Sequence, residues 1–331
     1  MNKIIIYCAL LLGINMSTAQ SLGGVLLAAE DANPLLENYF SPLTKGLMSS
    51  ANSGWYSTAK SHKKLGFDIT FGLNTAFTPK SEQMFEFIAD QYSFISTADG
   101  KTSIPTVLGK DGNSTTFDVS LPYQNGNFKV GSFELPGGIA KDLPINATPT
   151  PFVQVGLGLP FKTTIKLRYV PKTEFGSKVN ANLIGVGLQH DLTQYLGLIG
   201  KLPFSVSLFG AYTKTTIDYA IGNTSVTSLV TVRNGLAAYK LNTWTLQALG
   251  SLDFKIMTFY GGFGFNGGVS NFDIKGNYDL TYQVMSSENQ NMGTMSESIS
   301  DPIRLKFKST GTRATVGARL NLTFFKIFAD F

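Results

Sequence analysis

The stretch that decides the fold is residues 243–256, which read Thr-Trp-Thr-Leu-Gln-Ala-Leu-Gly-Ser-Leu-Asp-Phe-Lys-Ile. Apolar side chains occupy most even-numbered positions, from Trp244 to Ile256, and polar side chains occupy most odd-numbered ones. Successive side chains of a β-strand point to opposite faces of the sheet. This period of two therefore predicts a strand with one apolar and one polar face.

The same alternation recurs from Leu65 to the end of the chain, and several segments keep it for ten residues or more. Strands of soluble sheets average about 5 or 6 residues, whereas a tilted membrane-spanning strand needs about 9 to 11. The pattern predicts an all-β fold, an antiparallel transmembrane β-barrel of about 14 strands. The expected strands are 65–78, 84–97, 150–159, 161–170, 179–191, 203–217, 224–232, 240–254, 256–270, 272–284, 302–309, 311–324 and 325–331.

Two stretches lack this periodicity and read as long loops, residues 98–149 and 285–300. Aromatic residues stand near the ends of several expected strands, where the interfacial girdles of membrane barrels lie. Examples are Tyr169, Tyr212 and Trp244.

Composition excludes several other classes of protein. The chain has 331 residues, 43% hydrophobic, 12% aromatic and only 15% charged, so it is not disordered. A single cysteine excludes a disulfide scaffold. Outside the extreme N-terminus no run of about 18 apolar residues occurs, which excludes a helical membrane protein. A net charge of +5 is too small to indicate nucleic-acid binding. A soluble lipid-binding β protein stays open as an alternative.

The N-terminus predicts a secreted protein. Met1–Lys3 is a short basic region, Ile4–Ile14 an apolar core, and Ser17-Thr18-Ala19 a small-residue cleavage site. Residues 1–19 are therefore expected to be a cleavable signal peptide, and Cys8 to leave with it. Together with the barrel pattern, this predicts the outer membrane of a Gram-negative bacterium.

A helical segment precedes the strands, and residues 20–64 are predicted to form a plug inside a barrel spanning residues 65–331. Asn33-Pro34 and Ser41-Pro42 each place a capping residue before a proline, so two short helices broken at Pro42 are expected. Apolar residues at helical spacing form one face: Leu36, Tyr39, Phe40, Leu43 and Leu47.

The polar face of the expected strands carries ten lysines and arginines but only four acidic residues, Asp68, Asp253, Asp273 and Asp279. Like charges side by side destabilise a sheet, so something should offset them. One interpretation is salt bridges to plug acids (Glu30, Asp31, Glu37), or charges placed above the membrane. The other is an anion-attracting path for a carboxylate or phosphate head group. The predicted lumen-facing cations are Lys162, Lys166, Arg168, Lys255, Lys275, Arg304, Lys306, Lys308, Arg313 and Arg319.

No catalytic, metal or cofactor site is expected. His62 and His190 are the only histidines, and neither has ligand-type neighbours at useful spacing. His190 and Asp191 are adjacent on an expected strand, so they point to opposite faces and cannot pair. Gly261–Gly268 is glycine-rich, but no helix pattern follows, so curvature or close approach by the plug is favoured over a nucleotide site.

Three motifs resemble a family of secreted barrel proteins of unknown function from Bacteroidota. They are Gly54–His62 with Leu65–Asp68, Leu135–Gly138 with Pro151–Gly158, and Gly185–Leu192 with Leu202–Phe204. The plan is also similar, more distantly, to long-chain fatty-acid transporter barrels, which have a small helical N-terminal plug and 14 strands. In the first family a further strand follows the segment matching Phe325–Phe331, so either the closing strand is lacking here or that segment closes the barrel.

The leading functional hypothesis, by analogy of architecture, is passage of small hydrophobic or amphipathic molecules. A general porin and a structural or adhesive barrel without transport are the alternatives, and an embedded hydrolase is least favoured. The expected partners are outer-membrane lipid, an amphipathic small-molecule ligand and the barrel-assembly machinery, with no nucleic acid.

Overall fold

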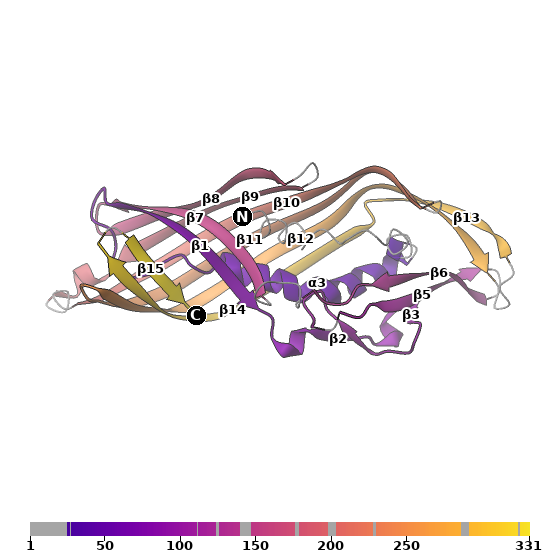
Figure 1. Cartoon of the computed structure of the whole chain (residues 1–331), viewed down its shortest axis with the longest axis horizontal. Helices are drawn as coiled ribbons and strands as arrows, with labels where there is room; N and C mark the ends of the chain where they lie inside the picture. Colours follow the sequence, from indigo (N-terminus) through magenta and orange to yellow (C-terminus); the bar gives the residue numbers. More distant parts are fainter. Residues whose placement is uncertain are drawn as a thin grey trace.

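The computed structural model describes residues 25–26, 28–110, 112–123, 126–139, 147–175, 179–197, 203–227, 230–285, 291–323 and 325–331. Its main element is a curled antiparallel sheet of ten strands, in the order β1-β7-β8-β9-β10-β11-β12-β14-β15 with β13 attached to β12 (Figure 1). These strands are β1 (Phe67–Phe77), β7 (Ala147–Leu159), β8 (Thr163–Phe175), β9 (Val179–Asp191), β10 (Phe204–Thr227), β11 (Val230–Asp253), β12 (Met257–Met285), β13 (Asn291–Ser300), β14 (Ile303–Leu322) and β15 (Phe325–Asp330).

The all-β antiparallel class is confirmed, but the main sheet has fewer and longer strands than expected. Two pairs of expected strands are single strands, namely β12 and β14, and the expected strand 224–232 is divided between the end of β10 and the start of β11. In β11 the Asn234-Gly235 step is a register shift rather than a turn, with Asn234 at φ 54°. A β-bulge adds residues to one strand without ending it, so the same residue types can mark either feature.

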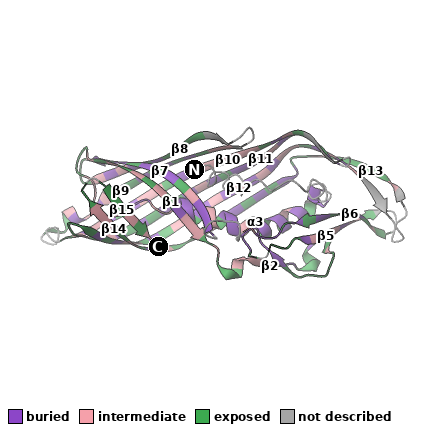
Figure 2. Ribbon diagram, viewed as in Figure 1, coloured by how far each residue is buried: buried purple, intermediate pink, exposed green. Residues whose placement is uncertain are grey.

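The long strands reverse their apolar face partway along, as β11 shows. After the bulge, Tyr239 and Leu241 are buried on the inner face, next to the exposed Lys240. Further along the strand, Thr245 and Gln247 occupy the same inner face. Exposed apolar side chains, such as Trp244 and Leu246, occupy the outer face there. β10, β12 and β14 change in the same way, and Figure 2 shows buried and exposed residues alternating along the strands.

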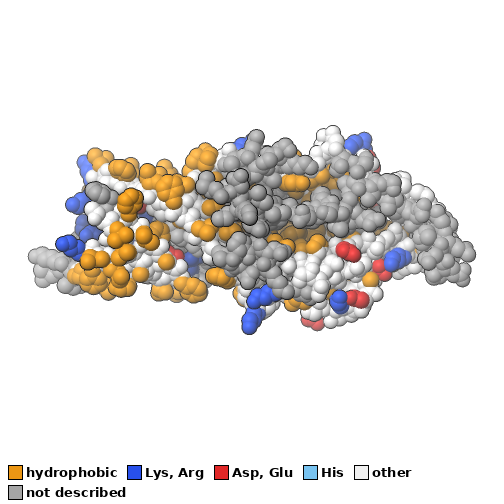
Figure 3. All heavy atoms as spheres, viewed as in Figure 1, with side chains coloured by type: hydrophobic (Ala, Val, Ile, Leu, Met, Phe, Trp, Pro, Cys, Tyr) orange, Lys and Arg blue, Asp and Glu red, His pale blue; other side chains and the backbone are white. Residues whose placement is uncertain are grey.

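The reversal divides the sheet into two halves. We call the half whose inner face is apolar the core half, and the half whose outer face is apolar the banded half. Figure 3 shows hydrophobic side chains gathered over the end of the sheet away from the small sheets. The exposed outward side chains that make this apolar band include Phe67, Ile69, Phe71, Leu73, Val153, Val155, Leu157, Leu167, Ile184, Val186, Leu188, Leu208, Tyr212, Trp244, Leu246, Leu252, Phe259, Phe263, Phe265 and Val316.

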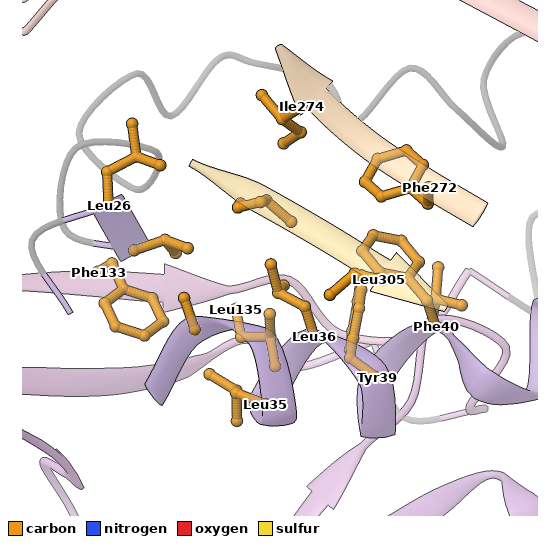
Figure 4. Close-up of a cluster of buried hydrophobic side chains, with 14 of the residues drawn as sticks. Leu26, Leu35, Leu36, Tyr39, Phe40, Phe133, Leu135, Phe272, Ile274 and Leu305 are labelled. Carbon is orange, nitrogen blue, oxygen red and sulfur yellow. The ribbon is translucent and has the colours of Figure 1, made fainter. Parts of the chain in front are cut away.

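Helix α3 (Ala29–Ala51) fills the core half. Leu35, Leu36 and Phe40 are buried against Phe272 and Leu305 of the sheet in one hydrophobic cluster (Figure 4). The Phe40 and Phe272 rings lie 5.5 Å apart. Burial in this cluster raises the pKa of the Tyr39 phenol well above its ordinary value, so this phenol stays neutral.

The expected break at Pro42 is wrong, because α3 continues through both Pro34 and Pro42. A proline inside a helix removes one backbone hydrogen bond and crowds the preceding turn. In that preceding turn the Tyr39 carbonyl oxygen accepts a hydrogen bond from the Val107 N–H at 3.1 Å. The bond that Pro42 removes would have gone to the Asn38 carbonyl, so this contact does not replace it, and the buried apolar face of α3 is what outweighs the local preference of proline.

Residues expected to form a strand and a loop instead build two small sheets that cover the other side of α3 (Figure 1). The first pairs β2 (Met84–Glu86) with β4 (Ser103–Pro105), and the second joins β3 (Ile95–Thr97), β5 (Thr115–Tyr123) and β6 (Gly126–Leu135). Short 3₁₀ turns are η1 (Lys80–Glu82), η2 (Ala89–Gln91) and η3 (Thr193–Tyr195). Within the expected loop 285–300, β13 pairs with β12.

The predicted signal peptide, residues 1–19, lies outside the described residues. Across the described ranges, no helix has both the length and the apolar character needed to cross a membrane.

Because the two faces of β14 are buried to different extents, we expect alanine substitutions on them to differ in their effect on the free energy of unfolding. Leu305→Ala should lower the free energy of unfolding by about 3 kcal/mol, because the 0% exposed leucine would leave a cavity beside α3. Val316→Ala is the control on the same strand, and its 66% exposed side chain should change stability by less than about 1 kcal/mol. Denaturant unfolding of both variants in detergent measures this, and equal losses would contradict the assigned faces.

Candidate functional site

The inner face of the banded half is occupied by the segment that follows α3, residues 52–62, which we call the plug segment. Its Trp55 and Tyr56 are buried together with Phe209 and Leu249 of the sheet. Trp55 packs directly over Gly185 and Gly187, where an added Cβ would lie about 3.0–3.1 Å from the indole. The glycines on β9 therefore let the plug segment approach the wall closely.

Arg168 ties the plug segment to β8. Its guanidinium carbon lies 4.0 Å from the centres of both the Trp55 and Phe152 rings. Its nitrogens donate to the Ala51 carbonyl at 3.1 Å and the Ser53 carbonyl at 3.0 Å, and to Gln154 Oε1 at 3.1 Å. Because these carbonyls lie at the C-terminus of α3, the cation also meets the negative end of the helix dipole.

Lys166 makes the neighbouring contact from the same strand. Its Nζ donates to the Trp55 carbonyl at 2.7 Å, which also accepts from Gln154 Nε2 at 3.2 Å. Lys166 and Arg168 are both buried. A buried cation is tolerated only when it is hydrogen-bonded, and backbone carbonyls of the plug segment meet that need here.

Arg313 and Arg319, on the inner face of β14, hold the plug segment from the other side. Arg313 donates to Ser53 Oγ at 2.7 Å and to the Ser49 carbonyl at 3.3 Å. Arg319 donates to Ser57 Oγ at 3.3 Å and lies 3.6 Å from Asp253. Four of the predicted lumen-facing cations therefore face inward and meet the end of α3 or the plug segment.

The partners of these cations differ from the plug acids considered from the sequence. Asp31 instead accepts three backbone N–H bonds, from Ser93, Phe94 and Ile95, at 2.6–3.0 Å. Glu30 and Glu37 are exposed. The tie between wall and plug is made by carbonyl and hydroxyl oxygens, which no charge pattern in a sequence reveals.

The lumen-facing placement of Arg304, Lys306 and Lys308 is wrong, because all three are exposed on the outer face. The expected strands 302–309 and 311–324 are one strand, β14, so side chains an odd number of residues apart point to opposite faces. Lys162 and Lys255 are exposed in links between strands, and Lys275 follows the buried Ile274 and points outward.

Both histidines contact polar side chains of neighbouring elements. His62 Nε2 lies 2.9 Å from Asp68 Oδ1, and His190 Nδ1 lies 2.9 Å from Thr163 Oγ1. Asp191 is buried on the face opposite His190 and accepts from the Thr193 N–H at 2.9 Å. Gly261–Gly268 lies within β12, and Gly262 is approached by the Tyr56 hydroxyl. Among the described residues, no group of three or more His, Cys, Asp or Glu could hold a metal ion.

A cleft of about 1050 Å³ opens between β1 and β15. β1 and β15 are the two edge strands of the main sheet. Eight successive antiparallel pairings lead from one to the other, so the two edge strands run in the same direction. The lining combines residues of β1 and β15, among them Leu73 and Phe328, with the C-terminal end of α3 and Arg313. Sequence reasoning missed this cleft because the cleft depends on which strands fail to pair.

The fold and this interior define the class of protein: a curled antiparallel sheet, apolar outside over one half, with a helix and a polar plug segment inside. The chain belongs to the family described as Family of unknown function (DUF6588), which matches residues 1–331. A comparison with curated proteins finds no match to the chain. The resemblance to a family of unknown function is thereby confirmed.

The Arg168 contacts predict that this side chain anchors the plug segment. Arg168→Ala should lower the free energy of unfolding by about 3 kcal/mol, because buried carbonyls would lose their donor. Leu167→Ala, next to it on the outer face and 53% exposed, is the matched control and should be nearly neutral. In a Trp244→Phe background, the emission of Trp55 should shift to longer wavelength in Arg168→Ala only; an unchanged spectrum and stability would contradict the anchor.

Proposed function

We propose that the curled sheet is the transmembrane wall of an outer-membrane barrel in a Gram-negative bacterium. We further propose that it takes up small hydrophobic or amphipathic molecules through the cleft between β1 and β15. The observation that carries this proposal is the coincidence of the cleft with the apolar band, since both include Phe71 and Leu73.

The size of the apolar band supports the membrane location. From Trp244 to Leu252 the outward positions of β11 are apolar or glycine, which spans ~27 Å along the strand. Strand tilt reduces this length across the membrane, and the apolar band of an outer-membrane barrel is about 25 Å tall. Tyr212 pairs with Trp244 where the band ends, as expected of an interfacial aromatic girdle.

The filled interior favours a lateral route over a wide aqueous pore. Trp55 and Arg168 are almost fully buried inside the banded half, and Tyr56 bonds across to Gln247 at 2.6 Å. A general porin needs a polar channel filled with water along the barrel axis. A molecule entering from the side of the sheet would avoid this obstruction.

The lining of the cleft fits an amphipathic anion. Apolar side chains such as Phe71 and Leu73 suit a hydrocarbon tail, and Arg313 offers a guanidinium at the polar side of the cleft. Guanidinium groups bind carboxylates through charge-assisted hydrogen bonds. A fatty-acid-like molecule is the simplest ligand with both features.

A pair of arginine variants tests this ligand class. Arg313→Gln should weaken binding of a fluorescent long-chain fatty acid about 10-fold, since a hydrogen bond to a charged group contributes about 1.5–3 kcal/mol. Arg319→Gln is the control, because Arg319 lies on the same inner face of β14 but not in the cleft lining. Fluorescence titration of the purified protein in mild detergent measures both, and equal affinities would contradict the role of Arg313.

Bilayer conductance on the same sample tests the route itself. Low conductance together with a co-purified acyl chain, detected by mass spectrometry, is the expected result. A steady conductance of wide-pore size without bound ligand would replace this proposal with a porin. If neither conductance nor a bound ligand is detected, a structural barrel without a transport role would be the supported alternative.

A further inference from the structure

Four lysines lie together on the outer face just beyond the apolar band: Lys214, Lys240, Lys306 and Lys308, which we call the lysine belt. Lys240 pairs with Asn271 across β11 and β12, and Asn271 pairs with Lys306 across β12 and β14. One row nearer the band, Lys214 and Lys308 are joined in register through Asn242 and Val269. The belt therefore occupies two adjacent rows across β10, β11, β12 and β14.

The belt directly adjoins the aromatic end of the band. The row next to Lys214 and Lys308 contains Tyr212, Trp244 and Gly267 in register, and the Tyr212 hydroxyl donates to Asn242 at 3.0 Å. Rows on one face of a strand are about 7 Å apart. The lysine ammonium groups thus stand within a side-chain length of the border between apolar and polar surface.

The four lysines are exposed, and among the described residues none of them forms an ion pair. The nearest outward acids are in the next row, Asp218 and Asp273, and Asp273 lies 3.8 Å from Arg304. Lys214 and Lys240 lie diagonally on neighbouring strands, and Lys306 stands two residues from Lys308 on β14, so like charges repel within this face. An anionic partner outside the protein would remove this repulsion.

We propose that the lysine belt binds the phosphate groups of anionic lipids at the membrane surface. The inference rests on the proposed membrane location of the apolar band. Lysine stems lie along apolar surface while their ammonium groups reach the head-group layer. Basic residues near an anionic membrane surface each add to binding in a salt-dependent manner. The surface favours a lipid over a free anion. The acyl tail would contact the apolar band, and the phosphate would contact the lysine belt in the adjoining rows of the same outer face.

The test compares lipid retention in wild type and in Lys240→Gln/Lys306→Gln/Lys308→Gln. Native mass spectrometry of the detergent-purified full chain, titrated with phosphatidylglycerol or phosphatidylcholine, counts the bound lipids. Wild type should prefer phosphatidylglycerol, and the triple variant should lose this preference by about 10-fold or more. Raising the salt concentration should reduce the preference of wild type and leave the variant unchanged.

The matched control is Lys101→Gln/Lys110→Gln/Lys129→Gln, which removes the same charge from exposed lysines in the region of the small sheets. It should keep the wild-type preference. An equal loss in both triple variants would overturn the belt as a specific surface and leave a net-charge effect.

Two further arms separate the possible failures. If inorganic phosphate displaces phosphatidylglycerol at matched concentration, the belt is a site for free phosphate and the lipid assignment is overturned. If the protein stays in the membrane after an alkaline carbonate wash but shows no phosphatidylglycerol preference, the belt proposal fails alone. If the wash releases the protein, the proposed membrane location fails first, and with it the basis of the belt.

Discussion

The structure depends on one constraint: between its bulges each long strand keeps side-chain alternation while its apolar face changes sides. In β11 the buried inner residues are Tyr239 and Leu241 in the core half but Thr245 and Gln247 in the banded half. The segments that pack against the inner face must therefore be apolar in one half and polar in the other. Amphipathic α3 meets the apolar half, and the polar plug segment meets the other, so the order of helix and segment along the chain follows from the order of the two faces.

The polar interior then explains why the wall cations and the plug segment require each other. Burying the Arg168 guanidinium without partners would cost several kcal/mol. The α3 C-terminus has carbonyls without intrahelical partners, which face the same problem. Each group supplies what the other lacks, and the Trp55 and Phe152 rings close over the contact. Lys166 and Arg168 are thus positioned mainly by backbone oxygens of α3 and the plug segment.

The period-two pattern predicted the all-β class, and apolar residues at helical spacing predicted the N-terminal helix, because both features depend on local patterns. The assignment of Arg304, Lys306 and Lys308 to the lumen failed because it depended on where strands end. Thr310-Gly311 resembles a turn, yet β14 passes straight through it, and one shifted boundary reverses a face. Pro42 misled for a related reason: its effect is decided by the burial of α3 against strands that lie far away in the sequence. The Arg168 contacts join residues more than 100 positions apart, and no local pattern encodes them.

The two groups of cations on β14 therefore differ in what they are free to bind. Lys306 and Lys308 have open surroundings on the outer face, whereas Arg313 already donates to Ser49 of α3 and Ser53 of the plug segment. A carboxylate that reaches Arg313 through the cleft has to compete with these two bonds. In the proposed function, ligand binding and the attachment of the plug at Ser53 are consequently linked, since each draws on the same guanidinium. Arg168 holds the Ser53 carbonyl independently, so the plug segment would stay anchored on the β8 side if a ligand took over the Arg313 guanidinium.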